Sequence, residues 1–169
     1  MENKIDKMTI QITEAIPSDT SLLSDLIRKS NQDVALRFNL TIENAPTHPS
    51  NCINDWVTAD FEKGKTYYVL REELKACGCV VIESADDQTF YLGRLGVLPE
   101  CRKKGYGTAL VEVAESEARK KGAILIQIGI IGENTELKKW YEKRGFIFKE
   151  NLHFDHLPFT VCIMYHNLS

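Results

Sequence analysis

The side chains best suited to binding chemistry gather in one short run near the middle of the chain. Arg102, Lys103 and Lys104 lead directly into the run Gly105-Tyr106-Gly107-Thr108, where a helical pattern begins. The first N–H groups of a helix have no internal partner, and together with the helix dipole they attract anions. The two glycines let a ligand approach the backbone without a Cβ in the way. The run predicts a phosphate or pyrophosphate cradle with added outer charge, and the plainer alternative is a glycine-containing turn beside a solvated basic edge.

The segments around this run predict the elements that position it. Thr89 to Val97 is a strand candidate that Pro99 stops, and Gly105 to Lys121 carries its apolar residues on one helical face. Ala123 to Ile130 is almost continuously apolar, which is typical of a strand buried on both faces. A strand, a helix and a buried strand in this order make the two strands parallel. The glycine run then lies at the carboxyl end of the first strand.

A second group of chemistry-bearing residues lies on a short predicted helix. Asn134 is placed to cap its first turn, and Gly145 ends it. Leu137 and Tyr141 are four residues apart and share one side of the helix with Trp140, which we expect to anchor the helix in the core. From these residues alone, a core aromatic is the simpler interpretation of Tyr141.

Taken together, the two groups resemble the signatures of the GCN5-related N-acetyltransferase (GNAT) superfamily. The first signature is Arg/Gln-x-x-Gly-x-Gly/Ala after a strand that ends in Leu-x-Val-x-Pro. Here Leu95-Gly96-Val97-Leu98-Pro99 precedes Arg102-x-x-Gly105-x-Gly107. The second signature is matched by Asn134, Leu137, Trp140-Tyr141 and Gly145-Phe146. The resemblance covers roughly residues 9 to 166.

This resemblance implies an α+β fold with αβα layers. The GNAT fold is a mixed, mostly antiparallel sheet of about seven strands with helices on both faces. A single GNAT acetyltransferase domain is expected over residues 1–169, with residues 1–8 as a flexible N-terminal extension. We also expect a splay between the strand ending at Val97 and the strand from Ala123, which would admit the cofactor.

The resemblance also implies an activity and roles for residues. Acetyl-CoA is the implied co-substrate for acetyl transfer to an amine by direct attack, with no metal. Tyr141 is implied to protonate the departing thiolate, and a phenol with a pKa of about 10 holds its proton at neutral pH. The implied cofactor-binding residues are Leu95, Gly96, Val97, Arg102, Lys103, Lys104, Gly105, Tyr106, Gly107, Thr108 and Asn134.

The sequence departs from the family in its general base. Tyr91 and Gly129 occupy the two positions where many members carry a glutamate. The substitutes that the sequence leaves open are Glu83, Glu133, His48, His156 and a water chain. An amine that arrives partly neutral would need less help from such a base. Because no base is evident, a non-catalytic acyl-CoA-binding module of the same fold is the alternative function.

The acceptor side is predicted from the longest irregular segment, residues 39–51. Pro46 and Pro49 stiffen it, which favours an ordered wall beside the acceptor pocket. The candidate acceptor contacts are Asn44, Thr47, His48 and, from the last hairpin, His156. The acceptor itself is expected to be a small-molecule or peptide amine.

Two other patterns point to different chemistry and are weaker. His153-x-x-His156 could begin a metal site, but the sequence offers no evident third ligand. Ala59-x-x-x-x-Gly64-Lys65-Thr66 matches a loosened P-loop, but a predicted helix precedes it and a predicted strand follows, the reverse of a P-loop.

Composition narrows the class of protein further. The 169 residues carry 21 Lys and Arg against 24 Asp and Glu, a net charge of −3, which does not favour nucleic-acid binding. No apolar run approaches the roughly 18 residues of a membrane span. Five cysteines at irregular spacing are expected to be reduced, buried thiols. We therefore expect a cytoplasmic protein without membrane or nucleic-acid partners, and a homodimer stays open.

Overall fold

The computed structural model describes residues 9–169, and the predicted extension over residues 1–8 lies outside the described residues. The described chain forms one seven-stranded sheet in the order β1-β2-β3-β4-β5-β7-β6. The strands are β1 Ile10–Glu14, β2 Thr66–Glu72, β3 Lys75–Ser84, β4 Thr89–Val97, β5 Leu125–Ile131, β6 Ile147–Leu152 and β7 Val161–Asn167. The helices are α1 Thr20–Ser30, α2 Gln32–Arg37, α3 Asn54–Glu62, α4 Tyr106–Lys120 and α5 Thr135–Glu142. The predicted fold, a mixed and mostly antiparallel sheet with helices on both faces, is confirmed.

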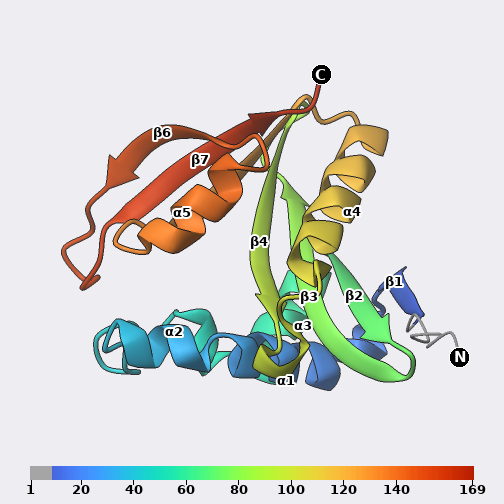
Figure 1. Ribbon diagram of the computed structural model, residues 1–169, viewed down its shortest axis with the longest axis horizontal. Helices are drawn as coiled ribbons and strands as arrows, with labels where there is room; N and C mark the ends of the chain where they lie inside the picture. The colour runs from blue at the N-terminus through green and yellow to red at the C-terminus, as the bar shows by residue number, and fades with distance from the viewer. Residues whose placement is uncertain (1–8) are drawn as a thin grey trace, which may run out of the picture.

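The helices cover the two faces of the sheet (Figure 1). The helix α4 packs on β2, β3 and β4, and α1 packs on β3 and β4 with α3 beside it. Glycines let these layers approach closely. A Cβ on Gly96 would lie 2.1 Å from Oγ of Ser30 in α1, and one on Gly78 would lie 3.1 Å from Leu110 in α4. The face of β4 at Gly96 is therefore closed by α1, and only its edge remains for a ligand.

The strands β4 and β5 separate soon after they meet. They pair in parallel only over Thr89–Tyr91 with Leu125–Gln127. Beyond that point β5 stays paired with β7, and β4 stays paired with β3. Within the described residues, the edge of β4 from Leu92 to Val97 has no strand beside it on the β5 side. The predicted splay is confirmed.

A bulge in β4 lies next to this splay. Gly93 pairs with Val81 and Gly96 pairs with Cys79, so two residues of β4, Arg94 and Leu95, oppose one residue of β3. Arg94 adopts a left-handed conformation with φ of +49°. Such conformations are uncommon for residues other than glycine, and bulges often re-aim side chains beside functional sites.

Leu22, Leu23, Leu26, Ile27 and Val34 follow one another at helical spacing, and the helix predicted from them is wrong in one respect. The sequence pattern predicts one helix up to about Phe38, but the structure breaks it at Asn31, where φ is −112° and ψ is 1°. The side-chain amide of Asn31 donates to the carbonyl of Ile27 at 2.8 Å. Asparagine side chains compete in this way with the backbone bonds that continue a helix. After the break, Arg37 at the end of α2 reaches Glu136 of α5.

Residues 9–169 contain no disulfide, no membrane-spanning helix and no metal-binding cluster. All five cysteines are buried free thiols, as expected. None of the helices in residues 9–169 is long and apolar enough to cross a membrane. In the same range, no cluster of three or more His, Cys, Asp or Glu side chains is placed to hold a metal ion.

Candidate active site

Two adjoining cavities lie at the splay between β4 and β5. The larger, of about 640 Å³, is lined by the start of α4, the end of β4, α2 and α5, and we call it the groove. The smaller, of about 330 Å³, is lined by β4, β5, residues 45–49 and residues 157–161, and we call it the inner cavity. Both are lined by Asn31, Val34, Leu95, Asn134 and Leu137. A long ligand in the groove could therefore present one end to a second molecule in the inner cavity.

The glycine run forms one wall of the groove. Lys103 and Gly105 both adopt left-handed conformations, with φ of +64° and +80°. Gly105 is the N-cap of α4, and no side chain caps this helix start. A Cβ on Gly105 would meet no atom within 4 Å, so the backbone there faces open space. Unsatisfied N–H groups at a helix start and in such turns attract phosphates.

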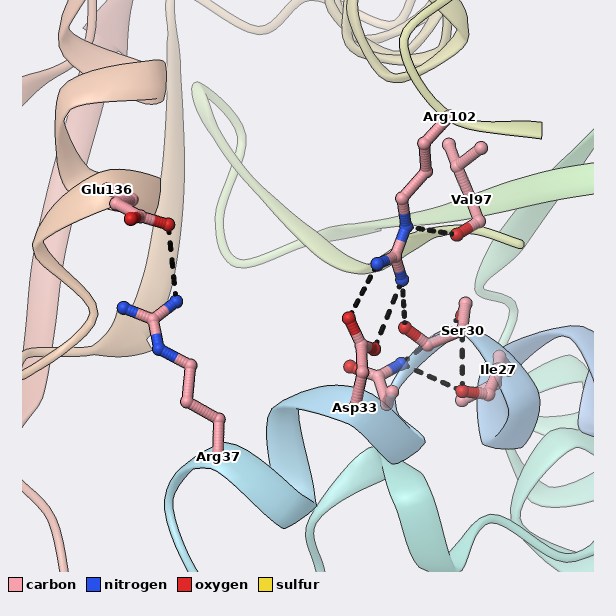
Figure 2. A network of polar contacts seen from close by, with 8 residues as sticks. Ile27, Ser30, Asp33, Arg37, Val97, Arg102 and Glu136 are labelled. Atoms are coloured by element: carbon pink, nitrogen blue, oxygen red, sulfur yellow. Dashed lines mark hydrogen bonds and ion pairs between the residues drawn. The ribbon is translucent and has the colours of Figure 1, made fainter. Parts of the chain in front are cut away.

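Two of the three expected cations are committed to carboxylates. Arg102 donates to both oxygens of Asp33 at 2.6 and 3.2 Å, to the carbonyl of Val97 at 3.0 Å and to that of Ser30 at 2.9 Å. Lys104 pairs with Glu72 at 2.9 Å. Figure 2 shows the side chain of Arg102 joining the end of β4 to α1 and α2. The expectation of three outer charges is corrected for Arg102 and Lys104, whose contacts hold the loop in place.

The opposite wall of the groove comes from α5 and from Arg144, which lies in the turn after this helix. Trp140 is half-buried and packs against the core as expected, and it also lines the groove. The guanidinium of Arg144 lies 3.5 Å above the Trp140 ring and donates to Oγ1 of Thr108 at 2.9 and 2.5 Å. A Cβ on Gly107 would lie 3.2 Å from the Trp140 ring. Arg144 is not among the residues predicted for the site, although its spacing of four residues from Trp140 was a signal.

The mouth of the groove is crossed by one ion pair. Arg37 of α2 reaches Glu136 of α5 at 3.4 Å, and both residues line the groove. Figure 2 shows the two side chains extended toward each other from the two helices. The pair is exposed, so it stabilises the closed mouth only weakly.

Tyr141 lies between the core and the inner cavity. Its side chain is 4% exposed and packs edge-on against Trp140 and Phe146, with ring centroids 4.9 and 5.1 Å apart. The hydroxyl has no hydrogen-bond partner among the described residues, yet it is not sealed from solvent, and the residue lines the inner cavity. Burial raises the pKa of Tyr141. The phenol is thus a fixed proton donor whose acceptor is not supplied by the described protein.

Comparison with known proteins identifies the family of this chain. The model of the acetyltransferase (GNAT) family matches residues 30–146. The chain belongs to the GNAT family. No curated protein matches it significantly. As a GNAT chain it shares its fold with distant solved structures.

Three of these structures are informative. Ribosomal-protein-S18-alanine N-acetyltransferase from Escherichia coli has a TM-score of 0.76 at 15% identity, covering 95% of each chain. PaiA N-acetyltransferase from Thermoplasma acidophilum, in complex with coenzyme A, has a TM-score of 0.76 at 17% identity, covering 95% of this chain and 99% of that one. YncA from Salmonella typhimurium, a putative acetyltransferase with acetyl-CoA, has a TM-score of 0.70 at 19% identity, covering 95% of each chain. Each shows likeness of fold alone.

The acceptor candidates of this GNAT chain divide into two groups. Thr47 and His48 line the inner cavity, as expected of acceptor contacts. Asn44 instead holds a turn: it accepts from the amide of Thr41 at 2.8 Å and donates to the carbonyl of Asn39 at 2.9 Å. His156 is exposed beside Phe154, and neither it nor Asn44 lines either cavity. Residue type alone could not separate the two groups, because each lies in a loop.

Most of the proposed substitutes for the general base lie outside the inner cavity. Glu83 pairs with Lys65 at 3.3 Å, and the carboxylate of Glu133 accepts from the amide of Thr160 at 3.0 and 3.2 Å. Neither glutamate lines the inner cavity. Tyr91 is exposed, whereas Gly129 lines the inner cavity without a side chain.

His48 is the imidazole that reaches the inner cavity. Its Nδ1 accepts from the amide of Ser50 at 3.2 Å and lies 2.7 Å from the Ser50 hydroxyl. Burial lowers the pKa of His48, so the ring is neutral at pH 7. With Nδ1 as an acceptor, the single proton of a neutral ring belongs on Nε2. In this tautomer Nε2 of His48 is a hydrogen-bond donor and does not accept a proton.

Arg94 is a cavity residue that the sequence analysis missed. The β4 bulge carries it, and it lines the inner cavity. Its guanidinium lies 3.3 Å from the carboxylate of Asp60 and 3.6 Å from Sγ of Cys52. The bulge comprises Arg94 and Leu95, and Gly93 directly before it is the one residue whose type signals it in the sequence.

Proposed function

We propose that this GNAT chain transfers an acetyl group from acetyl-CoA to a primary amine by direct attack. The observation that carries the proposal is the Tyr141 hydroxyl, a buried phenol in the wall of the inner cavity that has no hydrogen-bond partner among the described residues. Membership of the family supports acyl transfer as the class of reaction.

The groove residues fit acetyl-CoA. The uncapped start of α4 and the left-handed Lys103 and Gly105 would hold the pyrophosphate through their backbone. The unpaired edge of β4 around Leu95 would accept the pantetheine arm as an added strand would. Asn134 uses Oδ1 to cap α5 at 3.2 Å, which leaves its Nδ2 without a partner among the described residues. That amide lies in the wall common to both cavities, where the thioester would enter.

The chemistry needs one proton delivered and one removed. A C–N bond forms as the amine attacks the thioester carbon, the C–S bond breaks, and the sulfur takes up a proton. Because burial raises the pKa of Tyr141, its hydroxyl keeps its proton at neutral pH and can donate it as charge develops on sulfur. The packing of its ring against Trp140 and Phe146 fixes the position of that hydroxyl.

The proton of the amine goes to water in this proposal. Gly129 leaves the usual position of the base empty, and His48 has its Nδ1 bound to Ser50. The amine therefore reacts in its neutral form, drawn from the fraction that is deprotonated in solution. The rate per total amine should rise with pH as that fraction grows.

Purified protein with acetyl-CoA and a panel of amines tests the proposal, with thiol release and the mass of the acetylated amine as readouts. We expect both products in equal amounts with at least one amine class. Tight binding of CoA with no thiol release from any amine would support the alternative, a non-catalytic acyl-CoA-binding module.

A further inference from the structure

The inner cavity combines apolar walls with hydrogen-bond donors. Ile128, Ile130, Leu157 and Phe159 contribute to its walls. Among the described residues that line it, Arg94 is the one with a formal charge, and neither an aspartate nor a glutamate lines it. A cavity that selects amines with several positive charges would need carboxylates in its walls. The charge of this cavity has the opposite sign.

Arg94 has donors to spare for a ligand. Its one carboxylate partner, Asp60, is buried and shared: Lys65 lies 3.1 Å from Oδ1, and the hydroxyl of Tyr67 donates to Oδ2 at 2.5 Å. A guanidinium carries five N–H donors, and the contacts with Asp60 and Cys52 use only part of them. The side chain is 23% exposed although it lies in a cavity wall. A partly desolvated guanidinium of this kind is well suited to bind a carboxylate through two N–H groups.

His48 adds a neutral donor to the same cavity. Its Nδ1 is an acceptor for the Ser50 amide, so the ring proton is on Nε2, which has no partner among the described residues. The side chain is largely buried, and Nε2 is not among the sealed polar atoms. The residue lines the cavity, so this nitrogen is available to donate to a ligand oxygen.

We propose that the acceptor is a small primary amine that carries one carboxylate and an apolar body. Arg94 and His48 bind the carboxylate, the apolar body packs on the walls from β5 and residues 157–161, and the amine faces the junction with the groove. A cavity of about 330 Å³ fits a molecule the size of a single apolar amino acid. The inference rests on the proposed acetyl transfer and names the substrate class for it.

Matched substrates test the inference on the wild-type protein. Leucine is compared with 3-methylbutylamine, which is leucine without its carboxylate, and with spermidine as a polycation. The kcat/KM of each is expressed per neutral amine, because their amine pKa values differ. We expect leucine to exceed 3-methylbutylamine by at least about thirtyfold, in line with a charge-assisted bond, and spermidine to be the poorest of the three.

Two variants assign this preference to the cavity. In Arg94→Gln the ratio of kcat/KM between leucine and 3-methylbutylamine should fall below about threefold. The matched control is Arg28→Gln, which removes a guanidinium that also contacts Cys52 but lines neither cavity, and should keep the ratio. If Arg94→Gln fails to fold, His48→Asn replaces it, because asparagine can still cap the turn at Ser50 while it lacks Nε2.

The outcomes separate the inference from the function beneath it. If no amine in any arm releases thiol, the proposed transfer fails and the substrate class fails with it. If amines are acetylated but leucine gains nothing over 3-methylbutylamine, or spermidine is preferred, the transfer stands and the substrate class is overturned. An unchanged ratio in Arg94→Gln, with leucine preferred in the wild type, would overturn the assignment to Arg94.

Discussion

Arg102 and Asp33 form a two-point ion pair, with N–O distances of 2.6 and 3.2 Å. The same guanidinium bonds to the carbonyls of Val97 and Ser30, so one side chain joins β4, the end of α1 and the start of α2. The glycine run begins three residues after Arg102, at Gly105. We therefore expect the pair to fix where the run begins, so that Arg102 would act on the proposed cofactor site by positioning the loop.

Replacing Asp33 by asparagine should loosen this loop. Removal of the carboxylate leaves Arg102 with its two carbonyl partners only, and we expect acetyl-CoA affinity to fall about threefold to tenfold. Calorimetric titration with acetyl-CoA measures the change. Asp25→Asn is the control, because Asp25 pairs with Arg28 on α1 and lines neither cavity. Equal affinities for wild type and Asp33→Asn would show that the pair does not position the loop.

The same variant carries a pH signature. The hydrogen bond from Arg102 lowers the pKa of Asp33 below its usual range. A carboxyl with a lowered folded-state pKa contributes stability above its unfolded value, about 3.9, and loses it as pH falls through the folded value. The melting temperature of Asp33→Asn should therefore lie below that of the wild type at pH 7. This difference should shrink steadily below about pH 4.

Gly107 separates α4 from the aromatic wall of the groove. A valine there would bring its Cβ to 3.2 Å from the Trp140 ring and place its methyl groups in the groove. We expect Gly107→Val to weaken acetyl-CoA binding at least about tenfold, or about 1.4 kcal/mol. Ser116→Val adds the same side chain to the exposed face of α4 and controls for the helix propensity of valine. Unchanged affinity in Gly107→Val, with both variants folded, would mean that the cofactor does not use this part of the groove.

Glu72 links the start of α4 to β2. The hydroxyl of Tyr106 donates to its carboxylate, and this bond raises the pKa of Tyr106 to about 12. Glu72→Gln removes the hydrogen bond and the negative charge that oppose ionisation of Tyr106, so one tyrosine should titrate at lower pH than in the wild type. Ultraviolet absorbance against pH counts the phenols in each protein. Glu73→Gln is the control: the Glu73 carboxylate accepts from the amide of Thr9 at 2.9 Å, and the variant should titrate as the wild type does.

The parts of this protein that follow from sequence are those with local signals. Asn134 caps α5, with its Oδ1 accepting from the amide of Leu137, and its residue type and spacing predict that bond. The glycine run and the near-continuous apolar strand after α4 likewise predict a parallel pair and a helix start between them. These features depend on neighbours within a few residues or one crossover, which a linear pattern records.

The parts that do not follow from sequence depend on distant partners. Arg102 and Asp33 are 69 residues apart, so nothing in the run 102–108 shows that its arginine is already paired. The bulge at Arg94 depends on the register between β4 and β3, which the alternation within β4 alone does not fix. The inner cavity is lined both by Asn134, whose role as a helix cap follows from local sequence, and by Arg94, whose position depends on the bulge. Its substrate class could therefore be inferred only from the structure.

Tyr141→Phe is the decisive test of the chemistry. The variant keeps the ring and its contacts with Trp140 and Phe146, and removes only a hydroxyl that has no hydrogen-bond partner among the described residues. Loss of a general acid typically costs 10²–10⁴-fold in rate, so kcat should fall by about that factor. The dissociation constant of acetyl-CoA should change little, since the hydroxyl acts mainly as charge develops on sulfur.

Tyr68→Phe supplies the matched control for this variant. Tyr68 is also buried and its hydroxyl is also unpartnered, but that oxygen is sealed from solvent and the residue lines neither cavity. Its removal should leave kcat unchanged and raise the melting temperature slightly, because a buried unsatisfied hydroxyl is costly. A kcat of Tyr141→Phe within about threefold of wild type would mean that solvent or another group protonates the thiolate. A large fall in the melting temperature of Tyr141→Phe, with Tyr68→Phe unaffected, would instead make Tyr141 a structural residue of α5.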